Sequence, residues 1–238
     1  MNSILEGACL VDWDQALMRN IVSLEVSEDL FDDLSGDPAD QEAAIAHEMA
    51  IKPPFYSDRP AIIHRPFEES EWFASIDYPF HHWARTRYSD GAFGVWYGAP
   101  NASTTVYETV YHWMRFLADA EGYDRPPATI ERKVYEVHCR ALLIDLRPLV
   151  GKHPELVHPD DYQFTQQIGH RLHAQGPPGL LSRSARCDGD IAAVLTPDVL
   201  SKPSFRFGLS YDWDGECVRV RRGEEAEWMV LRDPLGRH

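Results

Sequence analysis

The sequence has few basic residues: 23 Lys and Arg stand against 38 Asp and Glu, which leaves a formal net charge of -15. Proteins bind nucleic-acid phosphates through clustered Lys and Arg, so this balance argues against a nucleic-acid-binding protein. No apolar run approaches the roughly 20 residues of a membrane span, and the first residues lack the basic and apolar regions of a signal peptide. The sequence therefore predicts a cytoplasmic protein with no membrane contact.

Several common cofactor signatures are also missing. The four cysteines lie far apart and form no CxxC pair, so neither a zinc site nor a compact disulfide framework is indicated. The sequence has no GxGxxG, GxxxxGK[ST] or GxSxG motif. It therefore does not indicate a Rossmann dinucleotide site, a P-loop or the nucleophile elbow of a serine hydrolase. The pairs His81–His82 and His170–His173 have no carboxylate or Cys at ligand spacing, so no metal is expected.

The chain divides by composition near residue 60. Residues 1–60 carry 13 acidic side chains against three basic ones, and the spacing of apolar residues in 27–50 favours short helices. Residues 52–60 contain three prolines, which favours an extended linker. We therefore expect an acidic, helical N-terminal extension over residues 1–60 and a catalytic domain over residues 61–238.

The second part mixes strand and helix patterns without a regular βαβ rhythm. Helices are predicted from Thr105 to Gly122 and from Asp160 to Gly176, each with apolar residues at helical spacing and a Gly at its end. Strands are predicted at 61–64, 94–99 and 133–146, on both sides of the turn in 177–195, and around Asp214-Gly215. These elements together predict an α+β fold.

One polar segment, residues 87–108, begins with Arg87 and closes on Glu108. An Arg fork can hold a diphosphate, a Tyr such as Tyr97 can stack on a planar ring, and a carboxylate can stabilise an oxocarbenium-like sugar. Together with a Ser from the later segment SRSAR, these groups are sufficient to cleave the bond between nicotinamide and ribose in NAD. Nicotinamide in NAD is a cationic leaving group, so no strong general acid is needed.

The order and spacing of these residues resemble the RES domain, a family named for its Arg, Glu and Ser. Arg87 is followed by Tyr97 in GVWYGAP, by Glu108 in STTVYETVYHW and by Ser184 in GLLSRSAR. The resemblance covers roughly residues 61–238. It implies a fold similar to that of ADP-ribosyltransferases, with a split β-sheet core and flanking helices.

The RES resemblance further implies an NAD-consuming toxin of a toxin–antitoxin system. NAD is then the substrate: Arg87 holds its phosphates or ribose, Tyr97 stacks on nicotinamide, and Glu108 stabilises positive charge at C1′. Ser184 fixes the nicotinamide ribose or a phosphate, and Arg186 is a second phosphate contact. The implied partner is an Xre-like antitoxin that plugs the cleft, and the charge of -15 favours basic residues on it.

The residues leave alternatives open at three positions. Arg85 and Arg65 compete with Arg87, and Ser182 competes with Ser184. Glu108 follows Thr105 by three residues, a spacing typical of a helix capping box, and Ser103 or Thr104 is the expected N-cap. If Tyr97 faces a cleft, strand alternation leaves Trp96 to pack in the core.

Two other functions remain open at this stage. The same oxocarbenium can be captured by a protein side chain, which would make the chain an ADP-ribosyltransferase acting on a protein target. A non-catalytic binding module that keeps the RES fold is the second alternative. Cleavage of NAD by water or phosphate, as a glycohydrolase or a phosphorylase, is the function that the residues favour.

Overall fold

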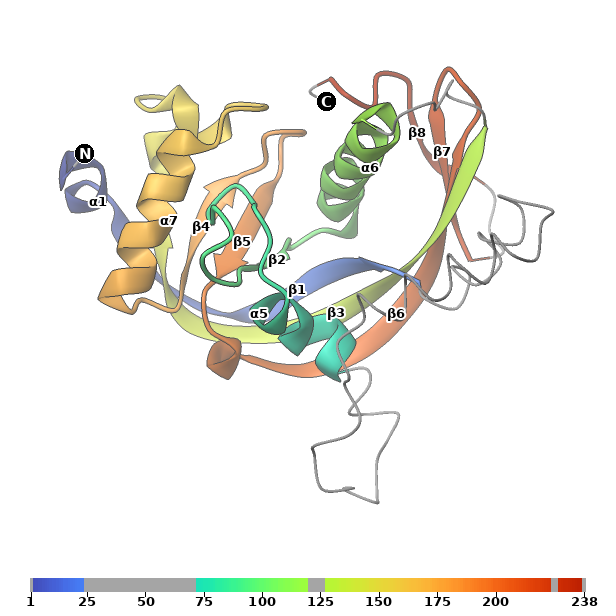
Figure 1. The fold of residues 1–238 in the computed structure, drawn as a ribbon. Coiled ribbons are helices and arrows are strands. Elements are labelled where there is room, and N and C mark those ends of the chain that lie inside the picture. Colours follow the sequence, from blue (N-terminus) through green and yellow to red (C-terminus); the bar gives the residue numbers. More distant parts are fainter. Residues whose placement is uncertain (1, 24–71, 120–126, 224–226, 237–238) are drawn as a thin grey trace, which may run out of the picture.

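The computed structural model describes residues 2–23, 72–119, 127–223 and 227–236, and these segments form a mixed α+β fold (Figure 1). The strands are β1 (Cys9–Val22), β2 (Trp96–Gly98), β3 (Ala128–Asp145), β4 (Gly179–Arg183), β5 (Asp190–Val194), β6 (Leu200–Trp213), β7 (Val218–Arg222) and β8 (Glu227–Leu231). The α-helices are α1 (Asn2–Glu6), α5 (Tyr78–His81), α6 (Ala102–Asp119) and α7 (Gln163–Gln175). Short helical turns are η1 (Phe73–Asp77), η2 (Arg147–Leu149), η3 (Pro154–Val157) and η4 (Pro197–Val199). The predicted α+β class is confirmed.

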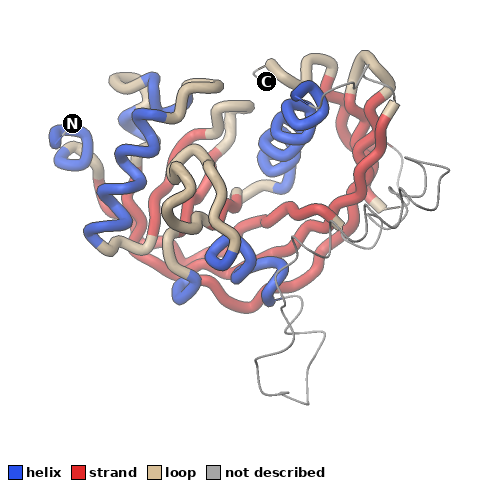
Figure 2. Tube along the Cα trace, viewed as in Figure 1, coloured by secondary structure: helices blue, strands red, loops and turns tan. Residues whose placement is uncertain are grey.

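All the described strands belong to one sheet, which divides at β3. The order is β2-β5-β4-β3-β6-β7-β8, and β1 pairs with β3 outside this path. β6 pairs with β3 from Ala128 to Cys139, whereas β4 pairs only with Ile144 and Asp145. The sheet therefore splits into a β4-β5-β2 branch and a β6-β7-β8 branch, and Figure 2 shows its strong curvature.

The structure corrects the prediction of a separate helical extension for the first part of residues 1–60. Cys9–Val22 is a strand, and it pairs with β3 in an unbroken antiparallel register from Cys9↔Asp145 to Val22↔Arg132. Only the short helix α1 precedes it. The helices predicted in 27–50, the linker at 52–60 and the strand at 61–64 lie outside the described residues.

The helices α6 and α7 lie on the concave side of the curved sheet (Figure 1). Both were predicted from apolar spacing, and α7 ends where expected, because Gly176 adopts φ 84° and its N–H bonds to the carbonyl of Leu172. The β6–β7 hairpin also forms at Asp214-Gly215, with Gly215 at φ 102°. These local signals were strong enough to be correct without knowledge of the tertiary fold.

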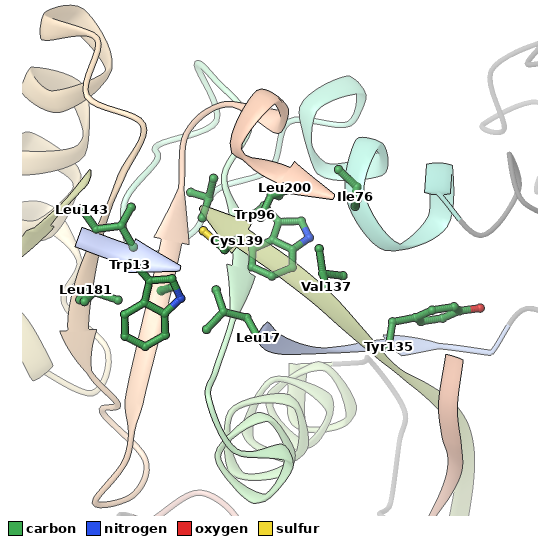
Figure 3. Packing of buried hydrophobic residues seen from close by; sticks show 12 residues of the cluster. Trp13, Leu17, Ile76, Trp96, Tyr135, Val137, Cys139, Leu143, Leu181 and Leu200 are labelled. Carbon is green, nitrogen blue, oxygen red and sulfur yellow. The ribbon is translucent and has the colours of Figure 1, made fainter. Parts of the chain in front are cut away.

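The core beneath the site is built around Trp96. Its side chain is fully buried, and Figure 3 shows it among Leu17 of β1, Val137 of β3 and Leu200 of β6. The indole Nε1 donates a hydrogen bond to the carbonyl of Ser75 at 2.7 Å. The expectation that Trp96 packs is therefore confirmed, and strand alternation turns its neighbour to the other face of β2.

The four cysteines are free thiols, of which Cys9 is exposed and the other three are buried. Across residues 2–23, 72–119, 127–223 and 227–236, no helix is long and apolar enough to cross a membrane. In the same segments, no group of three or more His, Cys, Asp or Glu side chains lies close enough to hold a metal ion.

Candidate active site

A cavity of about 360 Å³ lies against α6, and four of the residues singled out in the sequence line it. They are Arg85, Arg87, Tyr97 and Glu108. Small-molecule sites in proteins have volumes of roughly 300–1,000 Å³, so this cavity has room for part or all of a compact ligand. Further lining residues come from β1, β5 and the segment before α7, which are distant in sequence.

Helix α6 supplies one wall because its polar residues recur at helical spacing. Thr105, Glu108, Thr109 and His112 occupy positions i, i+3, i+4 and i+7, so they share a face of the helix, and all four line the cavity. The buried face packs into the core with Val106, Val110, Trp113, Met114 and Leu117. The amphipathic pattern of α6 thus presents its one acidic site residue, Glu108, to the cavity.

Glu108 is held by Ser184, although 76 residues separate them. The Ser184 hydroxyl donates to Glu108 Oε1 at 2.6 Å. The same Oγ accepts hydrogen bonds from the backbone N–H groups of Arg186 at 3.0 Å and Cys187 at 3.3 Å. Because both N–H donors use the serine lone pairs, the serine proton is directed at the carboxylate. Ser184 is fully buried and does not line the cavity, so it acts on Glu108 from behind.

The capping alternative for Glu108 does not fit the helix. α6 begins at Ala102, so Glu108 lies in its second turn and the expected N-cap positions, Ser103 and Thr104, lie inside its first turn. The Thr105 hydroxyl donates to the carbonyl of Ala102 at 2.6 Å, which is a contact within the helix. The prediction of an N-cap at residue 103 or 104 is wrong.

Ser182, the rival serine, lies on β4 opposite Ile191 of β5 and is fully buried. It does not line the cavity, and the serine that reaches Glu108 is Ser184. Among the described contacts, Ser184 and not Ser182 is thus the serine that bonds to Glu108.

Arg87 and Arg85 both line the cavity, but in different environments. Arg87 is buried, and its Nη1 donates to the carbonyl of His158 at 2.8 Å. Its guanidinium lies 4.5 Å from the ring centroid of Tyr162. Arg85 is exposed. Arg87 is therefore held by contacts inside the protein, whereas Arg85 lies at the surface. Arg65 lies outside the described residues.

Tyr97 faces the cavity with a fixed ring. Its hydroxyl donates to Thr86 Oγ1 at 3.0 Å and accepts from the backbone N–H of Tyr88 at 3.1 Å. Burial raises the pKa of the Tyr97 phenol well above its usual value, so the group is neutral at physiological pH. A neutral, oriented ring at a cavity wall can pack against a planar ligand.

Arg186 does not line the cavity. It is almost fully buried, its guanidinium lies 3.2 Å from the ring centroid of Tyr111, and its Nη2 donates to Tyr162 OH at 3.1 Å. Nη2 also donates to the carbonyl of Pro159. Arg186 therefore ties the segment around Tyr162 to α6, and through Tyr162 it supports Arg87.

Sequence reasoning did not find several of the lining residues, among them Arg19, Asn20, His112 and Tyr162. Arg19 and Asn20 lie in β1, inside the segment that composition had assigned to a separate extension. His112 carried a usable signal, because it follows Glu108 by four residues and so shares its helix face. Tyr162 directly precedes α7, and nothing local marks it as a site residue.

His112 lines the cavity and is classed as an exposed residue. Desolvation lowers the pKa of its imidazole; the Glu108 carboxylate opposes this effect, while Arg186, Arg87 and Arg132 reinforce it. The ring is therefore neutral at pH 7 and adds no positive charge to the site.

The charge of the cavity is opposite to that of the whole chain. Arg19, Arg85 and Arg87 line it, and Glu108 is its only lining carboxylate among the residues that the structure describes. The complete chain carries -15. The cavity therefore attracts an anionic ligand. The carboxylate of Glu108 would lie most favourably beside a neutral or cationic part of that ligand.

The structure combines an α+β fold with an arginine-lined cavity in which Ser184 holds the carboxylate of Glu108. The chain belongs to the RES domain family, whose model matches residues 62–214. This match contains Arg87, Tyr97, Glu108 and Ser184 but not β1.

No curated protein gives a significant match to the chain. Among solved structures, the chain is similar to one in the crystal structure of the M. tuberculosis MbcT–MbcA toxin–antitoxin complex. The identity is 14%, the match covers 89% of this chain and 90% of that chain, and the TM-score is 0.41.

Proposed function

We propose that the chain is an NAD-consuming enzyme that cleaves the bond between nicotinamide and ribose. The observation that carries the proposal is the Glu108–Ser184 pair, because it holds one carboxylate in a cavity whose other charged lining residues are arginines. This charge pattern suits a substrate that combines a diphosphate with a cationic nicotinamide riboside. The RES resemblance, which implies action on NAD, supports the same conclusion.

The reaction follows from the charges. When the C1′–N bond breaks, its electron pair goes to nicotinamide, whose ring nitrogen loses its positive charge, and C1′ becomes oxocarbenium-like. Glu108 stabilises that charge electrostatically, and Ser184 keeps the carboxylate oriented by its hydrogen bond. Water or phosphate then adds to C1′ and releases a proton. Arg87 binds the phosphates or ribose, and Tyr97 stacks on nicotinamide.

The buried positions of Ser184 and Arg186 refine their proposed roles. Neither lines the cavity, so direct contact with the substrate is not favoured for either residue. Ser184 acts as a positioning residue for Glu108, and Arg186 as a support for Tyr162 and Arg87. The substrate contacts then fall to Arg87, Tyr97 and Glu108.

Incubation with NAD tests the proposal and distinguishes its alternatives. If the chain is a glycohydrolase, we expect free nicotinamide and ADP-ribose to accumulate in the absence of phosphate. If it is a phosphorylase, we expect free nicotinamide to accumulate only when phosphate is added. The measurement is chromatography of the products with NAD labelled in the adenylate. Label that accumulates on a protein target with little free ADP-ribose would instead identify an ADP-ribosyltransferase. Intact NAD under all conditions would leave the binding-module alternative.

The proposed biological role is that of a toxin neutralised by an Xre-like antitoxin that plugs the cavity. The overall charge of -15 favours basic residues on the partner, whereas the arginine-lined cavity favours carboxylates on the segment that enters it. We expect pyrophosphate to compete with the partner for the cavity. We also expect the partner to bind more weakly when carboxylates are removed from its inserted segment. Calorimetric titration of the purified pair checks both results, and a partner that binds equally well with the cavity filled contradicts the plug.

A further inference from the structure

Strand β1 gives the cavity an arginine from outside the family-matched residues. β1 runs along β3, and Met18 forms two backbone hydrogen bonds with Ala99, of 2.7 and 3.0 Å, just beyond the end of β2. This contact sets the next residue, Arg19, beside Tyr97. Arg19 lines the cavity although the RES match begins at residue 62.

The hydrogen bonding of Arg19 is incomplete. Nη1 donates to the carbonyl of Tyr97 at 2.8 Å, and the guanidinium lies 5.5 Å from the ring centroid of Trp96. Nε is buried and makes no hydrogen bond to any of the described residues. No carboxylate from these same segments forms an ion pair with Arg19. The hydrogen bond of Nη1 thus positions the Arg19 side chain, while Nε remains free to donate a hydrogen bond to a ligand.

The surroundings of Arg19 destabilise its positively charged guanidinium when the cavity holds no ligand. Burial, together with the positive charge of Arg132, lowers the pKa of the guanidinium to about 10, and Tyr97 acts in the opposite direction. The group is still protonated at pH 7. A desolvated cation without a carboxylate is unfavourable unless another anion approaches it, and a ligand in the cavity is positioned to do so.

We propose that Arg19 binds phosphate oxygens of a ligand in this cavity, as a second cation beside Arg87. The proposal rests on the proposed NAD-cleaving function and adds a substrate contact to it. Two sources of phosphate oxygens fit the chemistry: the diphosphate of NAD and inorganic phosphate as the attacking group. In either case, β1 is a part of the active site rather than a separate extension.

Calorimetric titration with inorganic pyrophosphate and with inorganic phosphate tests the role without requiring turnover. Wild type is expected to bind at least one of them, and Arg19→Gln to bind it about 10-fold or more weakly, the effect of losing a charged hydrogen bond. A loss confined to pyrophosphate assigns Arg19 to the substrate diphosphate, and a loss confined to phosphate assigns it to the attacking group. In turnover, the matching KM should rise with kcat changed by less than about threefold.

Controls separate binding from folding. Arg140→Gln removes an exposed arginine of β3, whose side chain is 79% exposed, and should bind both anions as wild type does. Arg19→Lys keeps the charge but has fewer directed donors, and we expect an intermediate loss of about threefold. If Arg19→Gln does not fold, Arg19→Lys decides the question. Wild-type affinity in a folded Arg19 variant, or no anion binding by wild type, overturns the proposal, whereas failure of wild type to consume NAD overturns only the proposed function.

Discussion

Glu108→Gln is expected to lower the rate of NAD cleavage by about 10²-fold or more. The substitution keeps the size of the side chain and an oxygen that can accept from the Ser184 hydroxyl, whose bond to Glu108 is 2.6 Å long. It removes only the negative charge that would stabilise the oxocarbenium-like centre. The expected change is therefore in kcat, and it is measured by release of nicotinamide at saturating NAD.

Two companion variants make this result specific. Glu216→Gln changes an exposed residue of the β6–β7 hairpin and should leave the rate unchanged. Ser184→Ala keeps the carboxylate but removes its positioning hydrogen bond, so the expected loss is smaller, about 10-fold. If wild type consumes no more NAD, and is no more toxic on expression, than Glu108→Gln, the enzymatic proposal fails.

The elements that sequence reasoning found are those with local signals. α7 ends at Gly176 because a left-handed residue stops a helix, and the β6–β7 hairpin forms at Asp214-Gly215 because this pair suits a tight turn. α6 was found from its apolar spacing. In each case the evidence lies within a few residues, so the fold around it did not need to be known.

β1 was missed because its evidence is not local. The average acidity of residues 1–60 comes mainly from positions after Val22, and it obscured the strand that precedes them. What stabilises β1 is its pairing with β3, more than 100 residues away, and no sequence window contains both strands. Arg19 and Asn20 were lost from the predicted site for this single reason.

Asn20 shows what the missed strand contributes. Its buried Nδ2 donates to Tyr211 OH at 2.8 Å and lies 3.3 Å from the hydroxyl oxygens of Thr105 and Thr109 on α6. Its Oδ1 accepts from Arg132 Nε at 2.6 Å. One side chain of β1 thus links α6 to β3 and β6, so the wall that carries Glu108 is fixed to the sheet through a residue outside the RES match.

The family pattern predicted that Glu108 and Ser184 belong to one site, but it did not predict the hydrogen bond between them. Spacing alone left capping open for Glu108 and Ser182 open as a rival to Ser184, because a pair separated by 76 residues leaves no periodic trace in the sequence. The structure brings Ser184 to Glu108 through the turn between β4 and β5, where the Ser184 N–H bonds to the carbonyl of Gly189 at 2.7 Å. The direct phosphate contacts expected of Ser184 and Arg186 stay predictions, and their burial does not favour them.

Gly169→Ala is expected to destabilise the fold by about 2–3 kcal/mol and to lower the melting temperature by about 5–10 °C. Gly169 lies on α7 where the helix meets the segment that carries Arg87. A Cβ added there would be 1.8 Å from the carbonyl oxygen of Tyr88 and 2.7 Å from its carbonyl carbon. Both atoms belong to the backbone, so the clash can be relieved only by moving the helix or the segment.

The same displacement should also reduce activity, because α7 positions the segment around Arg87. One turn before Gly169, Gln166 Nε2 donates to the carbonyl of Thr86 at 2.9 Å and lies 3.3 Å from that of Ser89. A shift of about 1 Å in groups that bind substrate can lower a rate by about 10²-fold. We therefore expect Gly169→Ala to reduce NAD cleavage by about 10-fold or more at a temperature where the variant is still folded.

Gly151→Ala is the matched control for this prediction. An added Cβ at Gly151 meets no atom within 4 Å, so the same chemical change should alter neither the melting temperature nor the rate by a measurable amount. Thermal denaturation by circular dichroism and nicotinamide release report the two effects separately. A stable Gly169→Ala protein with the wild-type rate would show that α7 does not hold Arg87 in place. If Gly169→Ala lowers both the melting temperature and the rate of NAD cleavage while Gly151→Ala lowers neither, the contact between α7 and Tyr88 determines the geometry of the site.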